Sequence, residues 1–361
     1  NQKYLSNYFS ALVSSGNQNN EQALDYFNSS KFLIQKHDNF LKEYVYSLVL
    51  DGQIKKAIKQ VKHSQNQDFF EARLLLALES FNKKNYKKTE KRLNNLESFK
   101  DDGTYEFLIY KIFQSYNNLF LNNKVENIGE NFGKLNLITK AFQNCYLNSN
   151  KTRTYFLNII NSEQGDYSRY LFFYLGNLIE NKEYEIVNEI SQSINVHNSS
   201  LLISQAKNWI EQKKLKKFDK YFSCKNEKDI LAEFFFLISN LFSSEDNFEQ
   251  SNFYLNLSIY LNPKFYFNLS LLAENYYNNE NLDLSKKILN TFNKNDEIYE
   301  WYKTKKIAQI LNKQEKKDLS LKYIEEKFKN IKNPSIKILY DLANIYKNFK
   351  KYNKAIDYYS I

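Results

Sequence analysis

Residue types that commonly do chemistry are few in this sequence, and their spacing does not indicate a catalytic or metal site. The chain has three histidines, His37, His63 and His197, and two cysteines, Cys145 and Cys224. No histidine has a second ligand type four residues away, and the cysteines lack the short spacings of zinc sites. We therefore expect structural or surface histidines, and buried or partly buried cysteine thiols that fit any cellular compartment.

Sequence motifs of enzymes are missing as well. Seven scattered glycines do not form a phosphate-binding loop. Ser-His-Asp or Cys-His catalysis can use residues that are distant in sequence, so it stays open, but no nucleophile stands out. We predict a protein that is not an enzyme, with no catalytic residue, no metal site and no cofactor.

The strongest pattern lies in residues 232–361, where four segments repeat at a nearly constant spacing. Each segment has a small residue followed twelve positions later by another, and the first members are 34, 35 and 35 positions apart. The pairs are Ser239 and Ser251, Ala273 and Ser285, Ala308 and Ser320, and Ala343 and Ala355. An aliphatic residue precedes each first member, and a large apolar or aromatic residue follows each second member by four positions.

This spacing predicts two helices in each repeat segment. Apolar residues around the first small residue fall on one face of a 3.6-residue helix, and the small residues let two helices cross closely. Polar turns such as residues 243–247 separate the helices. Because one helical hairpin cannot bury its own apolar face, neighbouring hairpins must stack. The predicted fold is all-α, an α-solenoid of stacked antiparallel helix hairpins.

The pattern is weaker before residue 232. Degenerate pairs occur at Ala11 and Ala23, Val45 and Ala57, and Ala77 and Thr89. Further helices are expected at residues 105–121, 135–147, 153–160, 171–180, 184–190, 201–214 and 215–222. We predict three segments: 1–100 with about three repeats, 101–226 with irregular hairpins that continue the solenoid, and 227–361 with four regular repeats, the last truncated. The irregular middle either bends the solenoid or divides the chain into two subassemblies.

The small and aromatic positions, with Pro263 and Pro334 near the ends of repeats, resemble the tetratricopeptide-repeat (TPR) superfamily. Within residues 228–361, the runs 260–265 (YLNPKF), 271–274 (LLAE) and 298–301 (IYEW) also resemble a family of exported bacterial TPR proteins. The resemblance implies a right-handed superhelix and an exported scaffold, periplasmic or membrane-associated, without an assigned activity. It implies no catalytic residue, and a cytoplasmic location stays open.

The net charge of +10 comes from 51 basic and 41 acidic residues. We interpret it as dispersed over solvated helix faces, because the densest basic run, Lys213–Lys217, is short. No segment approaches the ~20 apolar residues that span a bilayer. The sequence starts with Asn and has no Met, so we expect an upstream segment, which could hold a signal peptide or a membrane anchor. Since Ile361 falls inside a predicted helix, we also expect further repeats or a capping helix.

The inner face of the predicted solenoid is the candidate binding surface. First helices line this face, at positions −3, +1 and +4 from the first small residue. The selected residues are Phe236, Asn240, Ser243, Ser270, Glu274, Tyr277, Lys305, Gln309, Asn312, Tyr340, Asn344 and Lys347. Asn amides can both donate to and accept from a peptide backbone, and aromatic rings add contact area. The alternative is an inner face that is only solvated.

Three functions remain open from the sequence. We predict a non-catalytic scaffold that binds a protein or peptide of unknown identity in the concave groove. Lys305, Gln309 and Asn344 resemble a clamp by which some TPR proteins hold a terminal carboxylate, although Asp341 argues against it. A nucleic-acid-binding helical-repeat protein is an alternative that the net charge favours and that Glu274, Asp341 and the scarcity of Arg oppose. The third is the scaffold part of a larger protein whose active domain lies outside this sequence.

Overall fold

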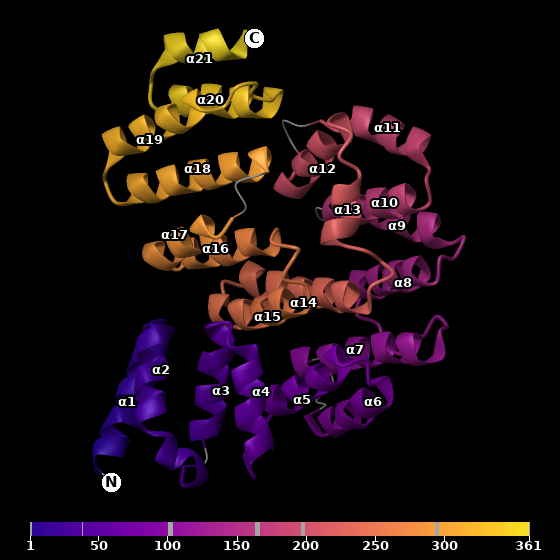
Figure 1. Ribbon diagram of the computed structural model, residues 1–361, viewed down its shortest axis with the longest axis vertical. Helices are drawn as coiled ribbons and strands as arrows, with labels where there is room; N and C mark the ends of the chain where they lie inside the picture. Colours follow the sequence, from indigo (N-terminus) through magenta and orange to yellow (C-terminus); the bar gives the residue numbers. More distant parts are fainter. Residues whose placement is uncertain are drawn as a thin grey trace. The chain divides into compact units, whose positions relative to one another are not determined.

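The structure is a computed structural model that describes residues 2–37, 39–99, 104–162, 167–195, 199–292 and 296–360. Within these ranges every regular element is helical, so the predicted all-α class is confirmed. Figure 1 follows the helices along the chain. His197 and Ile361, which the sequence analysis named, lie outside the described residues.

Contacts between residues group the chain into two compact units, and each unit joins two separate stretches of sequence. Unit 1 comprises Asn1–Tyr155 and Cys224–Asn268, and unit 2 comprises Phe156–Ser223 and Leu269–Ile361. The chain thus leaves unit 1 after Tyr155 and returns to it at Cys224. This grouping does not test the three predicted segments, because their boundaries follow changes in the regularity of the sequence repeat, whereas the units follow contacts between residues.

Unit 1 is built mainly from helix hairpins. Its elements are α1 (Gln2–Gly16), α2 (Asn20–Ser29), the 3-10 helix η1 (Lys31–Gln35), α3 (Phe40–Leu50), α4 (Ile54–His63), α5 (Phe70–Asn82), α6 (Tyr86–Asn94), η2 (Asn95–Phe99), α7 (Tyr105–Asn122), α8 (Lys134–Tyr146), the start of α9 (Thr152–Ile160), α14 (Glu227–Ser244) and α15 (Phe248–Leu261). Consecutive helices pack as the pairs α1–α2, α3–α4, α5–α6 and α14–α15.

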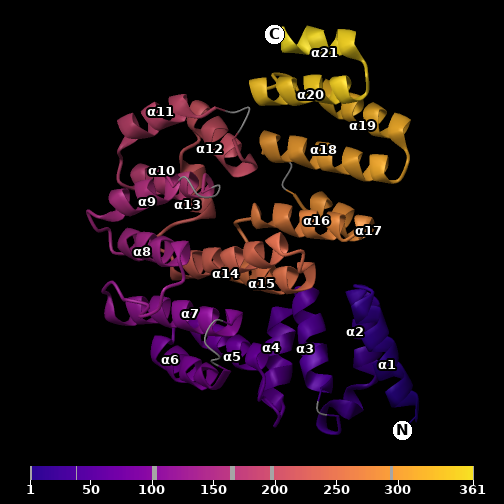
Figure 2. The ribbon, with the colours of Figure 1, turned by 180° about the vertical axis from the view of Figure 1, so that it is seen from behind.

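The hairpin α14–α15 packs on helices that are far away in the sequence. Helix α15 lies against α3 and α4, and α14 lies against α7, as both Figure 1 and Figure 2 show. The Tyr46 and Phe253 rings stack with centroids 4.9 Å apart. Nδ2 of Asn256 donates to the Leu50 carbonyl at 3.0 Å across 206 residues of sequence. The first regular repeat is therefore part of the core of unit 1.

Unit 2 contains the other hairpins. Its elements are the end of α9, α10 (Arg169–Glu180), α11 (Tyr184–Ser193), α12 (Leu201–Glu211), α13 (Lys216–Tyr221), α16 (Asn268–Asn278), α17 (Leu282–Asn290), α18 (Glu297–Lys313), α19 (Lys317–Lys329), α20 (Ile336–Asn348) and α21 (Tyr352–Tyr359). Helix α18 packs against α12 as well as α17 and α19. The helices expected at 171–180, 184–190, 201–214 and 215–222 are confirmed, with ends shifted by a few residues.

The small-residue pairs lie where the two helices of each hairpin cross, as predicted. All members of the four regular pairs are buried. In three hairpins the later hydroxyl also reaches back across the crossing: Ser251 Oγ lies 2.9 Å from Ser239 Oγ, Ser285 Oγ donates to the Ala273 carbonyl at 2.8 Å, and Ser320 Oγ donates to the Ala308 carbonyl at 2.9 Å. The twelve-residue spacing therefore places two small residues at a close contact between helices, and in three hairpins a hydroxyl group also reaches across that contact.

The hairpin turns carry a second repeat signal, in the backbone. One residue in each of nine turns is left-handed, with φ between 52° and 63°: Gln18, Lys84, Asn148, Lys182, Lys213, Asp246, Glu280, Glu315 and Lys350. From Asn148 to Asp246 these residues follow at 34, 31 and 33 positions, so the hairpin period continues through the segment where the sequence pattern is irregular. A non-glycine residue in this region costs about 1–2 kcal/mol.

Cys145 and Cys224 form a disulfide, so the prediction of free thiols is wrong, although both cysteines are buried as expected. Their Cα atoms are 5.7 Å apart, and 79 positions separate them in the sequence. Nζ of Lys225 donates to the carbonyls of Cys145 and Tyr146 beside the bond. The disulfide joins the end of α8 to the point where the chain returns to unit 1.

No segment of the sequence is apolar enough to span a bilayer, and the helices of the structure can be compared with that expectation. Among the described residues, none of the helices combines the length and the apolar character needed to cross a bilayer.

Candidate functional site

The predicted inner-face residues fall into both units. Phe236, Asn240 and Ser243 lie on α14 of unit 1, where Phe236 is buried, Ser243 is half-buried and Asn240 is exposed. The other nine lie on α16, α18 and α20 of unit 2. Among these nine, Gln309, Tyr340 and Lys347 are exposed, and Ser270, Glu274, Tyr277, Lys305, Asn312 and Asn344 are half-buried.

Glu274 on α16 is held by two side chains of α18. Its carboxylate accepts from Tyr302 Oη and from Lys306 Nζ, both at 2.7 Å. Burial, and then the charge of Glu274, raise the pKa of Tyr302 far above its ordinary value. The Tyr277 ring lies 4.6 Å from Lys306 Nζ and 4.9 Å from Lys313 Nζ. Glu274 and Tyr277 therefore serve contacts between neighbouring hairpins.

Lys305, the cation of the resembled clamp, binds a carboxylate of the chain itself. Its Nζ donates to Asp341 Oδ2 at 2.5 Å, and Trp301 Nε1 donates to the same oxygen at 3.2 Å. Tyr359 Oη donates to Asn344 Oδ1 at 2.7 Å. Asp341 thus occupies the ammonium group that a terminal carboxylate would need, in agreement with the argument against the clamp.

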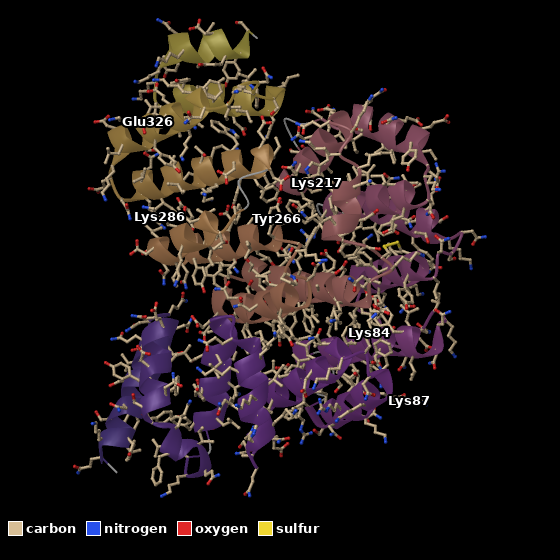
Figure 3. The ribbon with its side chains drawn as sticks, in the orientation of Figure 1. Lys84, Lys87, Lys217, Tyr266, Lys286 and Glu326 are labelled. Carbon is tan, nitrogen blue, oxygen red and sulfur yellow. A yellow bond between two sulfur atoms is a disulfide. The ribbon has the colours of Figure 1, made fainter. Side chains whose placement is uncertain are left out.

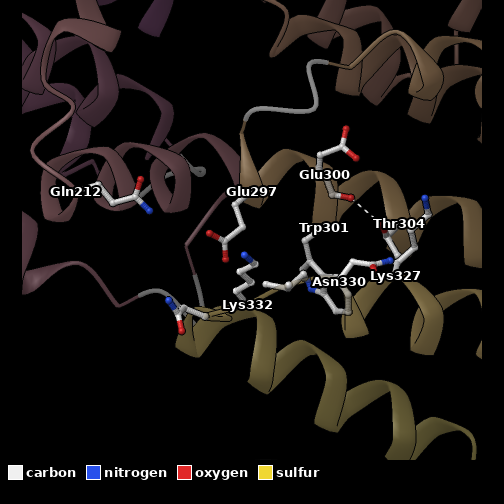
Figure 4. A pocket seen from close by; sticks show the side chains of 10 residues that line it. Gln212, Glu297, Glu300, Trp301, Thr304, Lys327, Asn330 and Lys332 are labelled. Carbon is white, nitrogen blue, oxygen red and sulfur yellow. Dashed lines mark hydrogen bonds between the residues drawn. The ribbon is translucent and has the colours of Figure 1, made fainter.

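The structure has a cleft of about 620 Å³ in unit 2 that the sequence did not suggest (Figure 4). Three elements supply its walls: the end of α12, the first two turns of α18, and the end of α19 with the connection that follows. The lining residues are Gln212, Glu297, Glu300, Trp301, Thr304, Lys327, Asn330, Ile331, Lys332 and Asn333.

A buried carboxylate fixes the two walls that α12 and α18 form. Asp296, which precedes α18, is 2% exposed. Its Oδ1 accepts from Trp209 Nε1 of α12 at 3.2 Å and from Lys217 Nζ of α13 at 2.9 Å, and its Oδ2 accepts from Tyr221 Oη at 3.2 Å. Figure 3 labels Lys217 on α13. Because three donors satisfy the carboxylate, the α12–α13 hairpin and the start of α18 are joined rigidly.

Two carboxylates of the cleft have oxygens that are poorly satisfied. Oε1 of Glu297 and Oε1 of Glu300 are buried and accept no hydrogen bond within the described residues. Nζ of Lys303 is 3.8 Å from Glu300 Oε1, which is ion-pair range only. Burial raises the pKa of Glu297, against the lowering effect of the Ser335 backbone and of Lys214. Buried acceptors without donors are costly, so a ligand gains binding energy if these side chains turn into the cleft and accept from it.

The rest of the lining suits a polypeptide. Gln212, Asn330 and Asn333 present carboxamides that can both donate to and accept from a peptide backbone. Lys327 and Lys332 are exposed, and they add positive charge to the cleft lining.

A second cleft of about 330 Å³ continues the first along α12. Its lining residues are Ser204, Lys207, Asn208, Glu211, Ile298, Pro334, Ser335, Ile336 and Lys337. The two linings meet at consecutive residues on three elements, at 211–212, 297–298 and 333–334. We call the two clefts together the α12–α18 groove. Ile336 is 67% exposed and supplies an apolar contact.

No protein-family model and no curated protein matches the chain. The resemblance to TPR proteins therefore stays a prediction from the repeat spacing. A group of three or more His, Cys, Asp or Glu side chains able to hold a metal ion is absent from the part of the chain that the structure describes.

Sequence reasoning had no signal for the α12–α18 groove. Gln212 and Asn333 are 121 positions apart, and they line one cleft only because α18 packs on α12. Glu297 and Glu300 look in the sequence like ordinary first-turn acids, which stabilise a helix N-terminus.

Proposed function

We propose that this protein is a non-catalytic scaffold that binds an extended peptide segment of a protein partner in the α12–α18 groove. The hairpins, their crossings and their turn period support a TPR-type solenoid wound as a right-handed superhelix. The observation that carries the binding proposal is the groove itself, which combines carboxamides, buried carboxylate oxygens without donors, and charges of both signs.

The groove is a better candidate than the predicted inner face. Glu274 and Lys305, two of the three charged residues of that face, are already paired with Lys306 and Asp341. A peptide that used them would first have to break these contacts, which costs free energy. Peptide donors could instead bond to Oε1 of Glu297 and Oε1 of Glu300, which accept no hydrogen bond within the described residues, once these side chains turn into the cleft.

We also propose that the protein is exported, to the periplasm of a bacterium or to a membrane-associated position outside the cytosol. The disulfide between Cys145 and Cys224 supports this, because such bonds persist mainly in oxidising compartments. Its closure of a long stretch of sequence fits a structural role better than a transient one.

A matched pair of substitutions tests the binding proposal. Gln212 lines the groove and Gln309 lies at an inner-face position, and both are exposed. Binding of the purified protein to an array of random peptides would be compared for the wild type, Gln212→Trp and Gln309→Trp. We expect only Gln212→Trp to lose the bound peptides, because the indole takes up part of the cleft that a peptide would enter.

The outcomes separate the two surfaces. Loss in Gln309→Trp alone would return the site to the predicted inner face. Failure of the wild type to select any peptide sequence would refute the proposed function.

A further inference from the structure

One stretch of unit 1, residues 54–94, is strongly basic. It holds 11 basic residues against 4 acidic ones, a net charge of +7. This stretch is longer than the basic run Lys213–Lys217. This segment forms α4, α5 and α6.

Exposed lysines lie along one side of α4 and along one side of α6. On α4, Lys55, Lys59 and Lys62 follow at four and three positions and are exposed, opposite a buried side of Ile54, Ala57, Ile58 and Val61. On α6, Lys87, Lys88 and Lys91 are exposed, opposite the buried residues Thr89 and Leu93. Each helix thus keeps its lysines in water and its apolar side in the core.

One carboxylate draws the two basic helices together. Glu79 of α5 lies 3.1 Å from Lys62 Nζ of α4, 2.7 Å from Lys83 Nζ and 3.2 Å from Arg92 Nη1 of α6. Burial alone would raise its pKa, but the hydrogen bonds from the three cations hold that pKa at about 2. The C-terminal ends of α4 and α6 therefore meet at Glu79.

Five exposed lysines of this stretch have no ion pair to a described residue after this pairing. Asp68 pairs with Arg73, and Lys84 pairs with Glu227 at 3.0 Å. The other lysines, which have no ion pair to any described residue, are Lys56, which is half-buried and donates to Gln53, and the exposed Lys55, Lys59, Lys87, Lys88 and Lys91. We call the five exposed lysines the lysine face. Figure 3 shows Lys87 directed away from the ribbon of α6.

The ammonium groups of the lysine face favour a partner that carries fixed negative charges. Such a partner can bind without specific hydrogen bonds or ring stacking. Lysine ammonium groups act as point charges, and the one arginine of α6, Arg92, is engaged by Glu79. Large aromatic side chains on which bases could stack are not among the exposed hydrophobic residues of α4 and α6. Phosphate groups of an anionic bilayer surface need only such charges, and they occur where disulfide-bonded proteins reside.

We propose that the lysine face docks unit 1 on an anionic lipid surface through its phosphate groups. The choice of lipid over nucleic acid rests on the proposed export, whereas the peptide groove is a separate site on unit 2. Each lysine near such a surface contributes about fivefold to binding. Removing three of the five should weaken binding about 100-fold.

The test uses the full, disulfide-intact chain and sedimentation with vesicles. Vesicles containing phosphatidylglycerol would be compared with vesicles of phosphatidylcholine only, at low and at high salt. The variant is Lys55→Gln/Lys59→Gln/Lys87→Gln. The matched control is Lys213→Gln/Lys216→Gln/Lys220→Gln, which removes the same charge from exposed lysines of unit 2.

We expect salt-sensitive binding to phosphatidylglycerol vesicles only, lost in the lysine-face variant and kept in the control. Equal loss in both variants would mean that net charge alone attracts the protein and would overturn the proposal. Tighter binding to duplex DNA than to vesicles, lost in the same variant, would assign the face to nucleic acid. Release by an equal concentration of soluble glycerol phosphate would assign it to isolated phosphate groups. Unchanged peptide selection by the lysine-face variant shows that the groove is independent.

Discussion

Replacing Asp296 by alanine should destabilise unit 2 strongly, because three donors lose their acceptor at once. Trp209 and Tyr221 are buried, whereas the Lys217 side chain is 25% exposed and can turn towards water. Breaking a buried charged pair by removing one partner costs about 3–5 kcal/mol. Since Lys217 regains some hydration, we expect a loss near the lower end, about 3 kcal/mol in the free energy of unfolding.

Urea unfolding followed by tryptophan fluorescence measures this loss directly. The chain has two tryptophans, Trp209 and Trp301, and both belong to unit 2. The signal therefore reports on unit 2 even if the two units unfold separately. Asp296→Asn, which keeps the shape and one acceptor, should lose less than Asp296→Ala.

Asp357→Ala is the control, because Asp357 is exposed on α21 and its loss should change stability by less than about 0.5 kcal/mol. A loss below about 1 kcal/mol in Asp296→Ala would refute the view that this network joins α12 to α18.

The remaining predictions concern the disulfide, Glu79 and a helix crossing. Cys145→Ala/Cys224→Ala should lower the free energy of unfolding of unit 1 by about 4 kcal/mol, because the disulfide closes a long loop in the unfolded chain. In urea unfolding, a reductant should have a similar effect on the wild type and no effect on the double variant. The pKa of Glu79 is lowered in the folded protein, so its stabilising effect is present above its unfolded pKa of about 4.5 and is lost as the pH falls towards about 2. In circular dichroism melts, Glu79→Gln should therefore lose less stability in acid than the wild type. Identical pH profiles would contradict this. Ala273→Trp should cost about 3 kcal/mol by overpacking the crossing with Ser285, whereas Gln309→Trp should leave the melting temperature nearly unchanged, and unchanged melting in both would contradict the register.

The helices and their crossings could be predicted because their signals are local. Ser239 and Ser251, or Ala273 and Ser285, sit one hairpin apart, and apolar periodicity in that short range reports directly on which side is buried. The hairpin turns were harder. Polar composition marked some turns, such as residues 243–247, but Lys84, Glu280 and Lys350 take left-handed angles without being glycine, so composition did not mark which turn residue takes that angle.

Contacts between distant parts of the chain could not be predicted. Asn256 reaches Leu50 across 206 positions, and Cys145 reaches Cys224 across 79. Neither pair has a local pattern, since each depends on how whole hairpins pack. The groove has the same origin: α18 and α12 meet through the buried Asp296, which looks in the sequence like an ordinary helix-capping residue.

The central claim is that a peptide binds in the α12–α18 groove, and the dissociation constant of one array-selected peptide tests it most directly. Calorimetric titration would compare the wild type with Gln212→Trp and Gln309→Trp. We predict that Gln212→Trp weakens binding at least about 10-fold, which is about 1.4 kcal/mol, while Gln309→Trp leaves the constant unchanged. An unchanged constant in Gln212→Trp, with the protein still folded, would contradict the account.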